Sequence, residues 1–230
     1  VTDSFKKYLI DLNINKNKIV VIKNGFNFER NLVHNKKKSE VKELYNVDSN
    51  NFVISYIGTI GMAHGVDIIL RAAEKIKNVS FLIIGEGAEK KKLINQCKKI
   101  NIQNVKFIDN LNWQEIVNIN QIIDANLIHL RDLEIFNTVI PSKIFESMAL
   151  GKPILAGLGG ESLEIIKDSN SGLKIIQDDE NSLIEQIRFL KKNKLLSKNL
   201  SENGIDYVKK NHDRKKLANK MIEYIESTID

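Results

Sequence analysis

Short apolar runs alternate with helical stretches along most of this 230-residue chain, and this alternation constrains the fold more than any other feature. Each run is a few residues long and rich in β-branched side chains, and the intervals between runs are long enough for a helix. Parallel strands joined by helices are covered on both faces, so they read as continuous apolar runs. The pattern therefore predicts an α/β domain with a Rossmann-like parallel sheet and helices on both faces. We expect strands at residues 52–57, 79–84, 105–108, 125–130, 153–156 and 172–176.

The first two helices between these strands each carry an apolar stripe at helical spacing. Cys97 lies on one of these stripes, which indicates an inert core side chain. It is the only cysteine, so no internal disulfide can form, which fits a reducing compartment. The residues expected to face the core are Ile69, Leu70, Ala73 and Ile76 in helix 66–76, and Leu93, Ile94, Cys97 and Ile100 in helix 89–100.

Both ends of the chain are expected to be mainly helical. The apolar run 18–23 predicts one additional strand, which ends at the turn signal Asn24-Gly25. No internal repeat or low-complexity linker interrupts the pattern, so residues 1–230 are expected to form one domain with C-terminal helices appended. The chain starts at Val1 instead of Met, which suggests a processed or truncated piece. The terminal helices are expected at residues 4–12, 39–45, 183–192, 196–211 and 215–227.

The stretch Ile140–Leu155, IPSKIFESMALGKPIL, is the most informative single segment. Pro141 suits the first turn of a helix, because its missing N–H is one of the donors that a helix start leaves unpaired. We expect this helix to run from about Pro141 to Leu150. Ser142 and Glu146, four residues apart, share one face, and the positive N-terminal end of the helix could receive an anion. The apolar stripe on another face consists of Ile144, Phe145, Met148 and Ala149.

The loops that follow the strands are the expected binding region, because ligands of open parallel sheets lie outside the carboxyl ends of the strands. The loop at 58–65, GTIGMAHG, follows the first core strand. Gly58 and Gly61 would let the backbone approach a ligand closely, although glycines are equally common in turns that bind nothing. His64 could donate to a phosphate or cap the following helix. The loop after Ile108 could offer backbone groups to a planar base.

The net charge of +6 is mild, and the Lys and Arg residues are spread over the expected helices. This distribution indicates solvated faces and no nucleic-acid partner, while contact with an anionic membrane surface stays open. No stretch reaches the ~20 apolar residues of a membrane span.

Arg131, Asp132 and Glu134 are interpreted as solvated loop charges, and residues 178–180 as a helix start. No His and Cys spacing is typical of zinc, so we expect neither a metal nor a cofactor.

Several segments, in their order and spacing, resemble the carboxyl-terminal half of the group 1 glycosyltransferases, the retaining family-four enzymes with the two-domain GT-B fold. Within that family the chain is most similar to bacterial enzymes that build O-antigen and capsule chains. The resemblance makes residues 1–30 an interdomain segment and residues 212–230 a C-terminal helix. The segments are VTDSFKKYL…IVVIKNGFN, IGTIGMAHGVDIILRAA, FLIIGEGAEKKKL, IPSKIFESMALGKPILA and GGESLEIIKDSNSGLKI.

The resemblance implies that the chain binds a nucleotide diphosphate sugar, usually a uridine diphosphate (UDP) sugar. Glu146 matches the second glutamate of the family's E-x7-E motif, which holds the ribose hydroxyls. Thr138 stands where the first glutamate would contact the donor sugar. Thr59 and His64 stand where a basic pair usually clamps the diphosphate. Lys143 can replace the missing positive charge on the first turn of the expected helix. With Ser142 and backbone donors near Ile140, it would stabilise the departing nucleotide diphosphate.

Lys143 and Glu146 are therefore the expected catalytic residues of a hexosyltransferase that works without a metal. The family binds its acceptor, a sugar or a lipid-linked chain, through an amino-terminal domain, so this fragment alone is expected to be inactive. The resemblance implies a cytoplasmic location, with peripheral contact at the inner face of the cell membrane left open. Two alternatives remain: a fragment of a nucleotide-sugar epimerase with the GT-B fold, and a non-catalytic interaction module.

Overall fold

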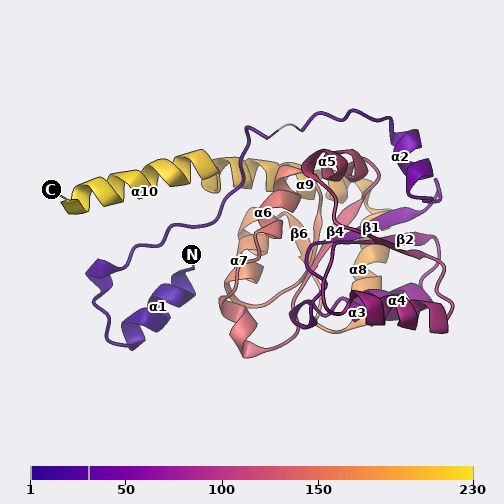
Figure 1. Cartoon of the computed structure of the whole chain (residues 1–230), viewed down its shortest axis with the longest axis horizontal. Helices are drawn as coiled ribbons and strands as arrows, with labels where there is room; N and C mark the ends of the chain where they lie inside the picture. Colours follow the sequence, from indigo (N-terminus) through magenta and orange to yellow (C-terminus); the bar gives the residue numbers. More distant parts are fainter. Residues whose placement is uncertain (1, 31, 230) are drawn as a thin grey trace.

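Six parallel strands form one sheet in the computed structural model, which describes residues 2–30 and 32–229 (Figure 1). The strand order is β3-β2-β1-β4-β5-β6, and every neighbouring pair is parallel. The predicted Rossmann-like α/β fold is confirmed. The order reverses between β1 and β4, and such a reversal leaves a crevice at the carboxyl ends of the two strands. The strands are β1 Phe52–Ile57, β2 Val79–Ile84, β3 Val105–Ile108, β4 Ala125–His129, β5 Ile154–Gly157 and β6 Gly172–Lys174.

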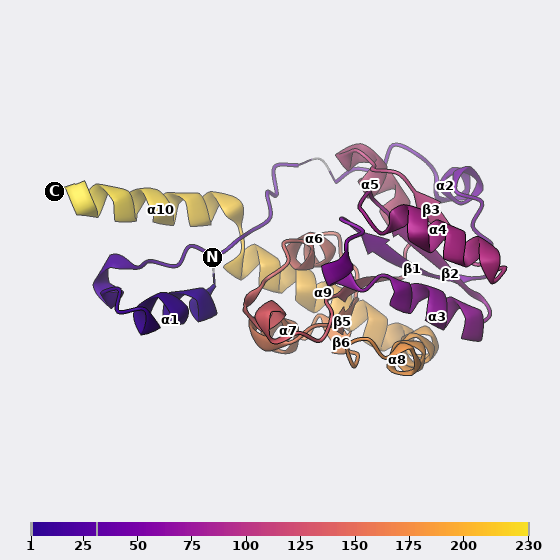
Figure 2. The same ribbon diagram turned by 60° about the horizontal axis from the view of Figure 1, so that its bottom comes forward.

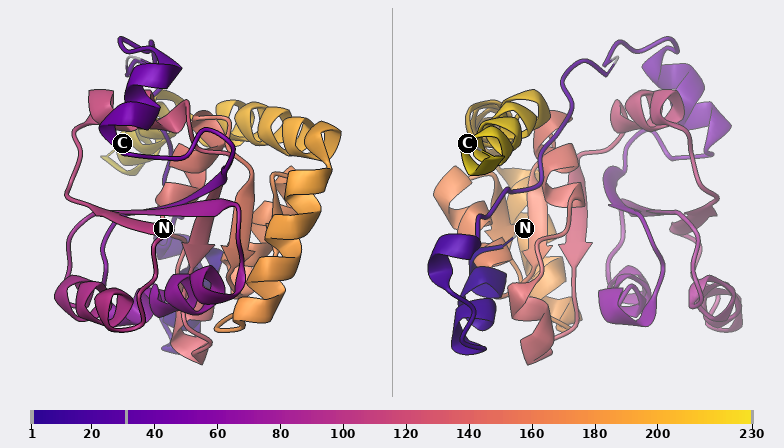
Figure 3. Two further views of the ribbon diagram at one scale, coloured as in Figure 1. Left: turned by 90° about the vertical axis from the view of Figure 1, so that its right-hand side faces the viewer. Right: turned by 60° about the vertical axis from the view of Figure 1, so that its left-hand side comes forward.

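Helices cover both faces of the sheet (Figure 3). Successive strand residues point to opposite faces, so Tyr56 of β1 packs with α3, α4 and α8, whereas Val53 packs with α2 and α5. Helices α6 and α7 pack on Ile128 of β4 and Ile154 of β5. The α-helices are α1 Asp3–Asp11, α2 Lys38–Leu44, α3 Asp67–Lys75, α4 Lys90–Lys99, α5 Trp113–Asn120, α6 Lys143–Ala149, α7 Gly160–Ser169, α8 Glu180–Lys192, α9 Lys194–Asn211 and α10 Arg214–Ile229. Short 3-10 helices are η1 Lys16–Lys18, η2 Met62–His64 and η3 Glu134–Thr138.

A buried chain of polar side chains attaches α6 to the sheet. Ser55 of β1 and Asn126 of β4 are partners in the parallel register, and the Ser55 hydroxyl donates to the Asn126 side-chain carbonyl. The Asn126 amide donates in turn to the hydroxyl of Ser147 in α6, at 2.9 Å. A buried polar group that lacks a partner is costly. These hydrogen bonds therefore fix the position of α6 over the junction of β1 and β4.

The first and last helices extend on the same side of the domain (Figure 2). The N-terminus of α1 is held by Glu161 at the start of α7, whose carboxylate accepts the N–H groups of Asp3 and Ser4 at 3.0 Å each. Helix α10 leaves Met221 and Ile222 about half exposed, at 51% and 52%. Neither these helices nor the others that the structure describes combine the length and the hydropathy that crossing a membrane requires.

Three local expectations differ from the structure. Residues 18–23 were expected to form a strand, but Lys18 ends the 3-10 helix η1 and residues 19–23 join no strand of the sheet. Ile100 is 41% exposed, because α4 ends at Lys99 and the chain turns outward there. Helix α6 begins at Lys143, two residues later than expected from Pro141, although its apolar stripe of Ile144, Phe145, Met148 and Ala149 is buried as predicted.

The loops after β1 and β2 pack so closely that a side chain at Gly85 would not fit. A Cβ built on Gly85 would lie 2.1 Å from the carbonyl oxygen of Gly58, and its φ of +142° is rarely adopted by other residues. We expect Gly85→Ala to lower the free energy of unfolding by roughly 2–4 kcal/mol in urea denaturation. Gly61→Ala is the matched control, because a Cβ there would meet its nearest atoms at 3.8 and 3.9 Å. Equal stability of the two variants would contradict the close packing.

Candidate functional site

The side chain of Lys143 joins α6 to the glycine loop, which we define as residues 58–65. Its Nζ donates to the Tyr56 hydroxyl at 3.1 Å and lies 4.3 Å from the centroid of the Tyr56 ring. The Tyr56 hydroxyl donates to the carbonyl oxygen of Thr59 at 2.5 Å. A Cβ built on Gly58 would lie 2.9 Å from Nζ, so the missing side chain of Gly58 makes room for the ammonium group. The start of the loop therefore lies against a lysine from another element, directly at Gly58 and through Tyr56 at Thr59.

Burial lowers the pKa of Lys143 to about 8, although the nearby Glu146 carboxylate acts in the opposite direction. The ammonium group is therefore mostly charged at neutral pH. Among the described residues no carboxylate oxygen lies within 4.0 Å of it. A desolvated cation without an ion-pair partner interacts strongly with an anion that enters its site.

Glu146 lies one helical turn after Lys143 and is partly exposed. The two side chains line the same small cavity, together with Ile57 and Leu150. Within the described part of the chain, the Glu146 carboxylate has no hydrogen-bond donor, so its acceptor positions remain available. The sequence placed Lys143 on the first turn of this helix and Glu146 one turn later, and their roles toward a ligand stay a prediction.

Inside α6 the backbone N–H groups are occupied from Ile144 onward. The N–H of Ile144 donates to the carbonyl of Pro141, and the N–H groups of Phe145 and Glu146 donate to that of Ser142. Among the described residues, the N–H groups of Ile140, Ser142 and Lys143 make no hydrogen bond, so the donors expected near Ile140 stay a prediction. Ser142 is exposed, and its hydroxyl does not cap the helix.

Ile108 and Ile140 were expected to contribute backbone groups, and their side chains offer nothing more to a ligand. The Ile108 carbonyl oxygen accepts a hydrogen bond from the N–H of Gly85 at 3.0 Å. One of its two lone pairs is therefore used in a contact between the ends of β2 and β3. Ile140 is 7% exposed and packs in the core below α6, which leaves only its backbone to face a ligand. The loop after Ile108 also carries Asp109, which pairs with Lys90 at 2.6 Å.

Thr138 lies apart from the Lys143 and Glu146 pair. Its hydroxyl donates to the carbonyl of Ile135 at 2.9 Å, inside η3. It lines a different cavity, of about 550 Å³, with Phe5 and Tyr8 of α1. The structure therefore places the predicted sugar-contacting position beside the N-terminal helix.

His64 does not act as the helix cap that was one of its two expected roles, because no side chain caps α3. Its ring lies 6.2 Å from that of Tyr56, centroid to centroid, and its Nδ1 atom is buried without a hydrogen-bond partner among the described residues. Burial, assisted by the charge of Lys143, lowers the pKa of His64 to about 4. The ring is therefore neutral at physiological pH and cannot supply a positive charge to a phosphate.

Arg131 was interpreted as a solvated loop charge, and that interpretation is wrong. Its guanidinium donates to the carbonyl of Met62 at 3.0 Å and pairs with Asp178 at 2.9 Å and Asp67 at 2.5 Å. Burial favours a raised pKa for Asp67, but Arg131 and Arg71 outweigh it and hold the pKa below its usual value.

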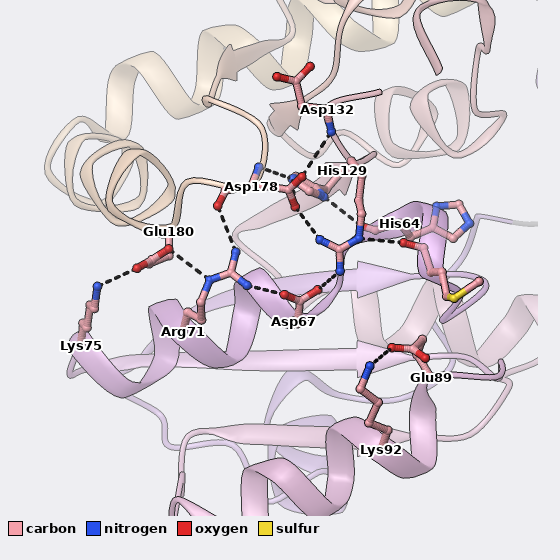
Figure 4. Close-up of polar contacts among 12 residues, drawn as sticks. His64, Asp67, Arg71, Lys75, Glu89, Lys92, His129, Asp132, Asp178 and Glu180 are labelled. Carbon is pink, nitrogen blue, oxygen red and sulfur yellow. Dashed lines mark hydrogen bonds and ion pairs between the residues drawn. The ribbon is translucent and has the colours of Figure 1, made fainter. Parts of the chain in front are cut away.

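The ion pairs continue away from the crevice (Figure 4). Arg71 pairs with Asp67 and with Glu180, the latter at 3.1 Å, and Glu180 pairs with Lys75 at 2.7 Å. Asp179 caps α8 through the N–H groups of residues 181 and 182, in agreement with the predicted helix start. Only the four-residue spacing of Asp67 and Arg71 could have signalled this network in the sequence. Within residues 2–30 and 32–229, no group of three or more His, Cys, Asp or Glu side chains is arranged to hold a metal ion.

The fold is that of a known class of proteins. The structure resembles that of HepE from Anabaena, solved in complex with UDP and glucose, with a TM-score of 0.84 over 98% of this chain and 62% of that chain, at 18% sequence identity. This likeness and the strand order define a Rossmann-like domain of the GT-B type.

Sequence comparisons then identify the family. The chain is 31% identical over 204 residues to an uncharacterized glycosyltransferase of Methanocaldococcus jannaschii, covering 89% of this chain and 52% of the relative. It is 26% identical over 185 residues to the O-antigen biosynthesis glycosyltransferase WclY of Escherichia coli, covering 76% of this chain and 47% of the relative. The model of the group 1 glycosyl transferases matches residues 37–207, and the chain belongs to this family. It spans about half the length of the curated relatives it matches.

Three histidines with lowered pKa values are expected to make the fold sensitive to acid. Burial lowers the pKa of His64, His129 and His212 below the ordinary value of 6.5. Below that pH the unfolded chain binds more protons than the folded chain, so the free energy of unfolding should fall as the pH decreases. We expect urea denaturation to show a steady loss of stability from pH 7 to pH 5, a range above the ordinary pKa of the carboxylates. His64→Leu should reduce the slope, and a stability that is independent of pH in this range would contradict the assignment.

Proposed function

We propose that this chain is the donor-binding domain of a retaining hexosyltransferase, which transfers a sugar from a UDP-linked donor to a growing surface polysaccharide or a lipid-linked acceptor. Membership of the group 1 family supports transferase chemistry. A relative of the chain is named for O-antigen biosynthesis, and a structural neighbour was solved with UDP and glucose. The single observation that carries the proposal is the ammonium group of Lys143, which lies beside Gly58 of the glycine loop and belongs to the same cavity lining as the free carboxylate of Glu146.

Lys143 would act on the diphosphate. Departure of a nucleoside diphosphate from the sugar leaves additional negative charge on the β-phosphate, and a fixed cation in a water-poor site stabilises that charge. Tyr56 holds the Lys143 amine by a hydrogen bond and by its ring, so the cation needs no reorganisation as the charge develops. In this proposal Lys143 replaces the basic pair that the family usually carries at the positions of Thr59 and His64.

Glu146 would hold the ribose. A carboxylate accepts hydrogen bonds from two neighbouring hydroxyl groups, and the ribose 2′ and 3′ hydroxyls form such a pair. The one-turn spacing of Lys143 and Glu146 would place the diphosphate and the ribose side by side along α6. The base would then lie toward the loop after Ile108. Acceptor binding and part of the catalytic machinery would belong to an additional domain, at the cytoplasmic face of the membrane.

Removal of the Lys143 charge should selectively weaken binding of the diphosphate. We expect Lys143→Met, which keeps the aliphatic stem on Tyr56, to weaken UDP binding roughly 10- to 100-fold, as for loss of a hydrogen bond to a charged group. Isothermal titration with UDP and ligand-observed NMR with uridine measure the two affinities, and the uridine affinity should stay unchanged. Equal affinity of the variant and the wild type for UDP would refute the role of Lys143.

The pH dependence gives a second measure of the same role. Since the pKa of Lys143 is about 8, the wild-type affinity for UDP should fall as the pH rises above 8, because the neutral amine does not attract a phosphate. The affinity of Lys143→Met should be flat over the same range. No binding of UDP by the wild type at any pH would instead favour a non-catalytic interaction module.

Glu146 is tested by a change in both the protein and the ligand. The wild type should bind UDP roughly tenfold more tightly than 2′-deoxy-UDP, and Glu146→Gln should lose most of this preference because the amide presents only one acceptor oxygen. Glu164→Gln is a matched control, since Glu164 is a surface residue of α7 that pairs with Lys167. A preference that survives in Glu146→Gln would place the ribose elsewhere.

A further inference from the structure

The far end of the glycine loop is held by a second group of donors, which come from the last residue of β4 and from Arg131 just after it. Three successive carbonyl oxygens of the loop accept hydrogen bonds from residues at the end of this strand. Arg131 binds the carbonyls of Met62, through Nε at 3.0 Å, and of Ala63, through its backbone N–H at 2.9 Å. His129 binds the carbonyl of His64 through Nδ1 at 2.8 Å. The strand end therefore sets the path of the loop opposite Lys143.

The hydrogen bonds of His129 define its protonation state. Its Nε2 accepts the backbone N–H of Asp178 at 3.0 Å, so the proton of the neutral ring is on Nδ1, where it is donated to the loop. Burial lowers the pKa of His129, which favours the same neutral form. The charged groups that face the ring are Asp178, whose carboxylate lies 3.9 Å from Nε2, and Arg131 and Asp67.

The ring also has no space to move. A Cβ built on Gly65 would lie 2.8 Å from its Cε1 atom, and a Cβ on Gly157 would lie 2.2 Å from its Cδ2 atom. Gly65 ends the glycine loop and Gly157 ends β5, so His129 fills the space between two neighbouring loops at the carboxyl edge of the sheet. The imidazole is 1% exposed and is held by shape as well as by its two hydrogen bonds.

We propose that His129 is a positioning residue of the donor site: its neutral ring transmits the position of the Asp178 turn and of β5 to the glycine loop, and so sets the distance between that loop and Lys143. This inference rests on the proposed function, because it assigns the loop to the diphosphate. The loop is anchored at its start by Tyr56 and at its end by His129. Loss of the tie between this second anchor and the Asp178 turn leaves the loop end without a fixed position, and it does not touch the residues assigned to the ribose and the base.

The experiment compares His129→Asn with His34→Asn as the matched control. His34 also donates through Nδ1 to a backbone carbonyl, that of Val117 at 3.0 Å, but it is an exposed residue outside the glycine loop. An asparagine at position 129 can keep the contact with the loop and cannot also accept the N–H of Asp178. We expect His129→Asn to bind UDP about tenfold or more weakly, with uridine affinity within about twofold of the wild type. His34→Asn should bind both ligands as the wild type does.

The outcomes separate this inference from the function on which it rests. The positioning role is refuted if the wild type and His129→Asn bind UDP equally well. It is also refuted if the affinities of the variant for UDP and for uridine fall by the same factor. In both cases the donor site stands. If the wild type does not bind UDP, both fail. If the variant does not fold, NMR spectra of the His129 ring in the wild type test the positioning role instead. Long-range nitrogen–proton NMR spectra should show His129 as the Nδ1–H tautomer at neutral pH, with ring signals that shift on addition of UDP. A protonated ring, or signals that UDP leaves unchanged, would overturn the proposal.

Discussion

Reversal of the strand order between β1 and β4 is the constraint on which the rest of this structure depends. The chain leaves β1 toward α3 on one face and leaves β4 toward α6 on the other, so their carboxyl ends face a crevice that no connection crosses. Side chains from both halves meet there. Lys143 reaches from α6 to Tyr56 of β1, and the buried Ser55, Asn126 and Ser147 chain keeps α6 at the distance at which this contact forms.

The crevice is organised by hydrogen bonds to the backbone of the glycine loop. Tyr56 holds its start, and Arg131 and His129 hold its end. A loop with so many of its carbonyls bonded has little freedom, and a rigid loop loses little entropy when it meets a ligand. The buried ring of His129 is neutral, and the charge of Arg131 is balanced by Asp67 and Asp178. Lys143 differs from both, because its ammonium group is charged and pairs with no carboxylate among the described residues.

The strands, most of the helices and the apolar stripes were predicted correctly because they depend on local periodicity. A strand buried on both faces must be apolar throughout, and a helix on a sheet must be apolar on one side, wherever it lies in the molecule. The strand expected at residues 18–23 was wrong because a strand also needs a partner, which periodicity does not supply. At the start of α6 the N–H groups of Ile144, Phe145 and Glu146 bond inside the first turn, and periodicity does not show this because it depends on how the preceding loop enters the helix.

The sequence by itself determined the parallel sheet, the side of α6 that faces the core and the one-turn spacing of Lys143 and Glu146, since each follows from the regular geometry of one element. Only the tertiary structure decided the roles of Arg131 and His129. Their partners, Met62, His64, Asp67 and Asp178, lie far from them in the sequence and arrive at the same place only because the sheet aligns the carboxyl ends of its strands. Long-range pairs of polar groups leave no periodic signal, so they become visible only when the chain has folded.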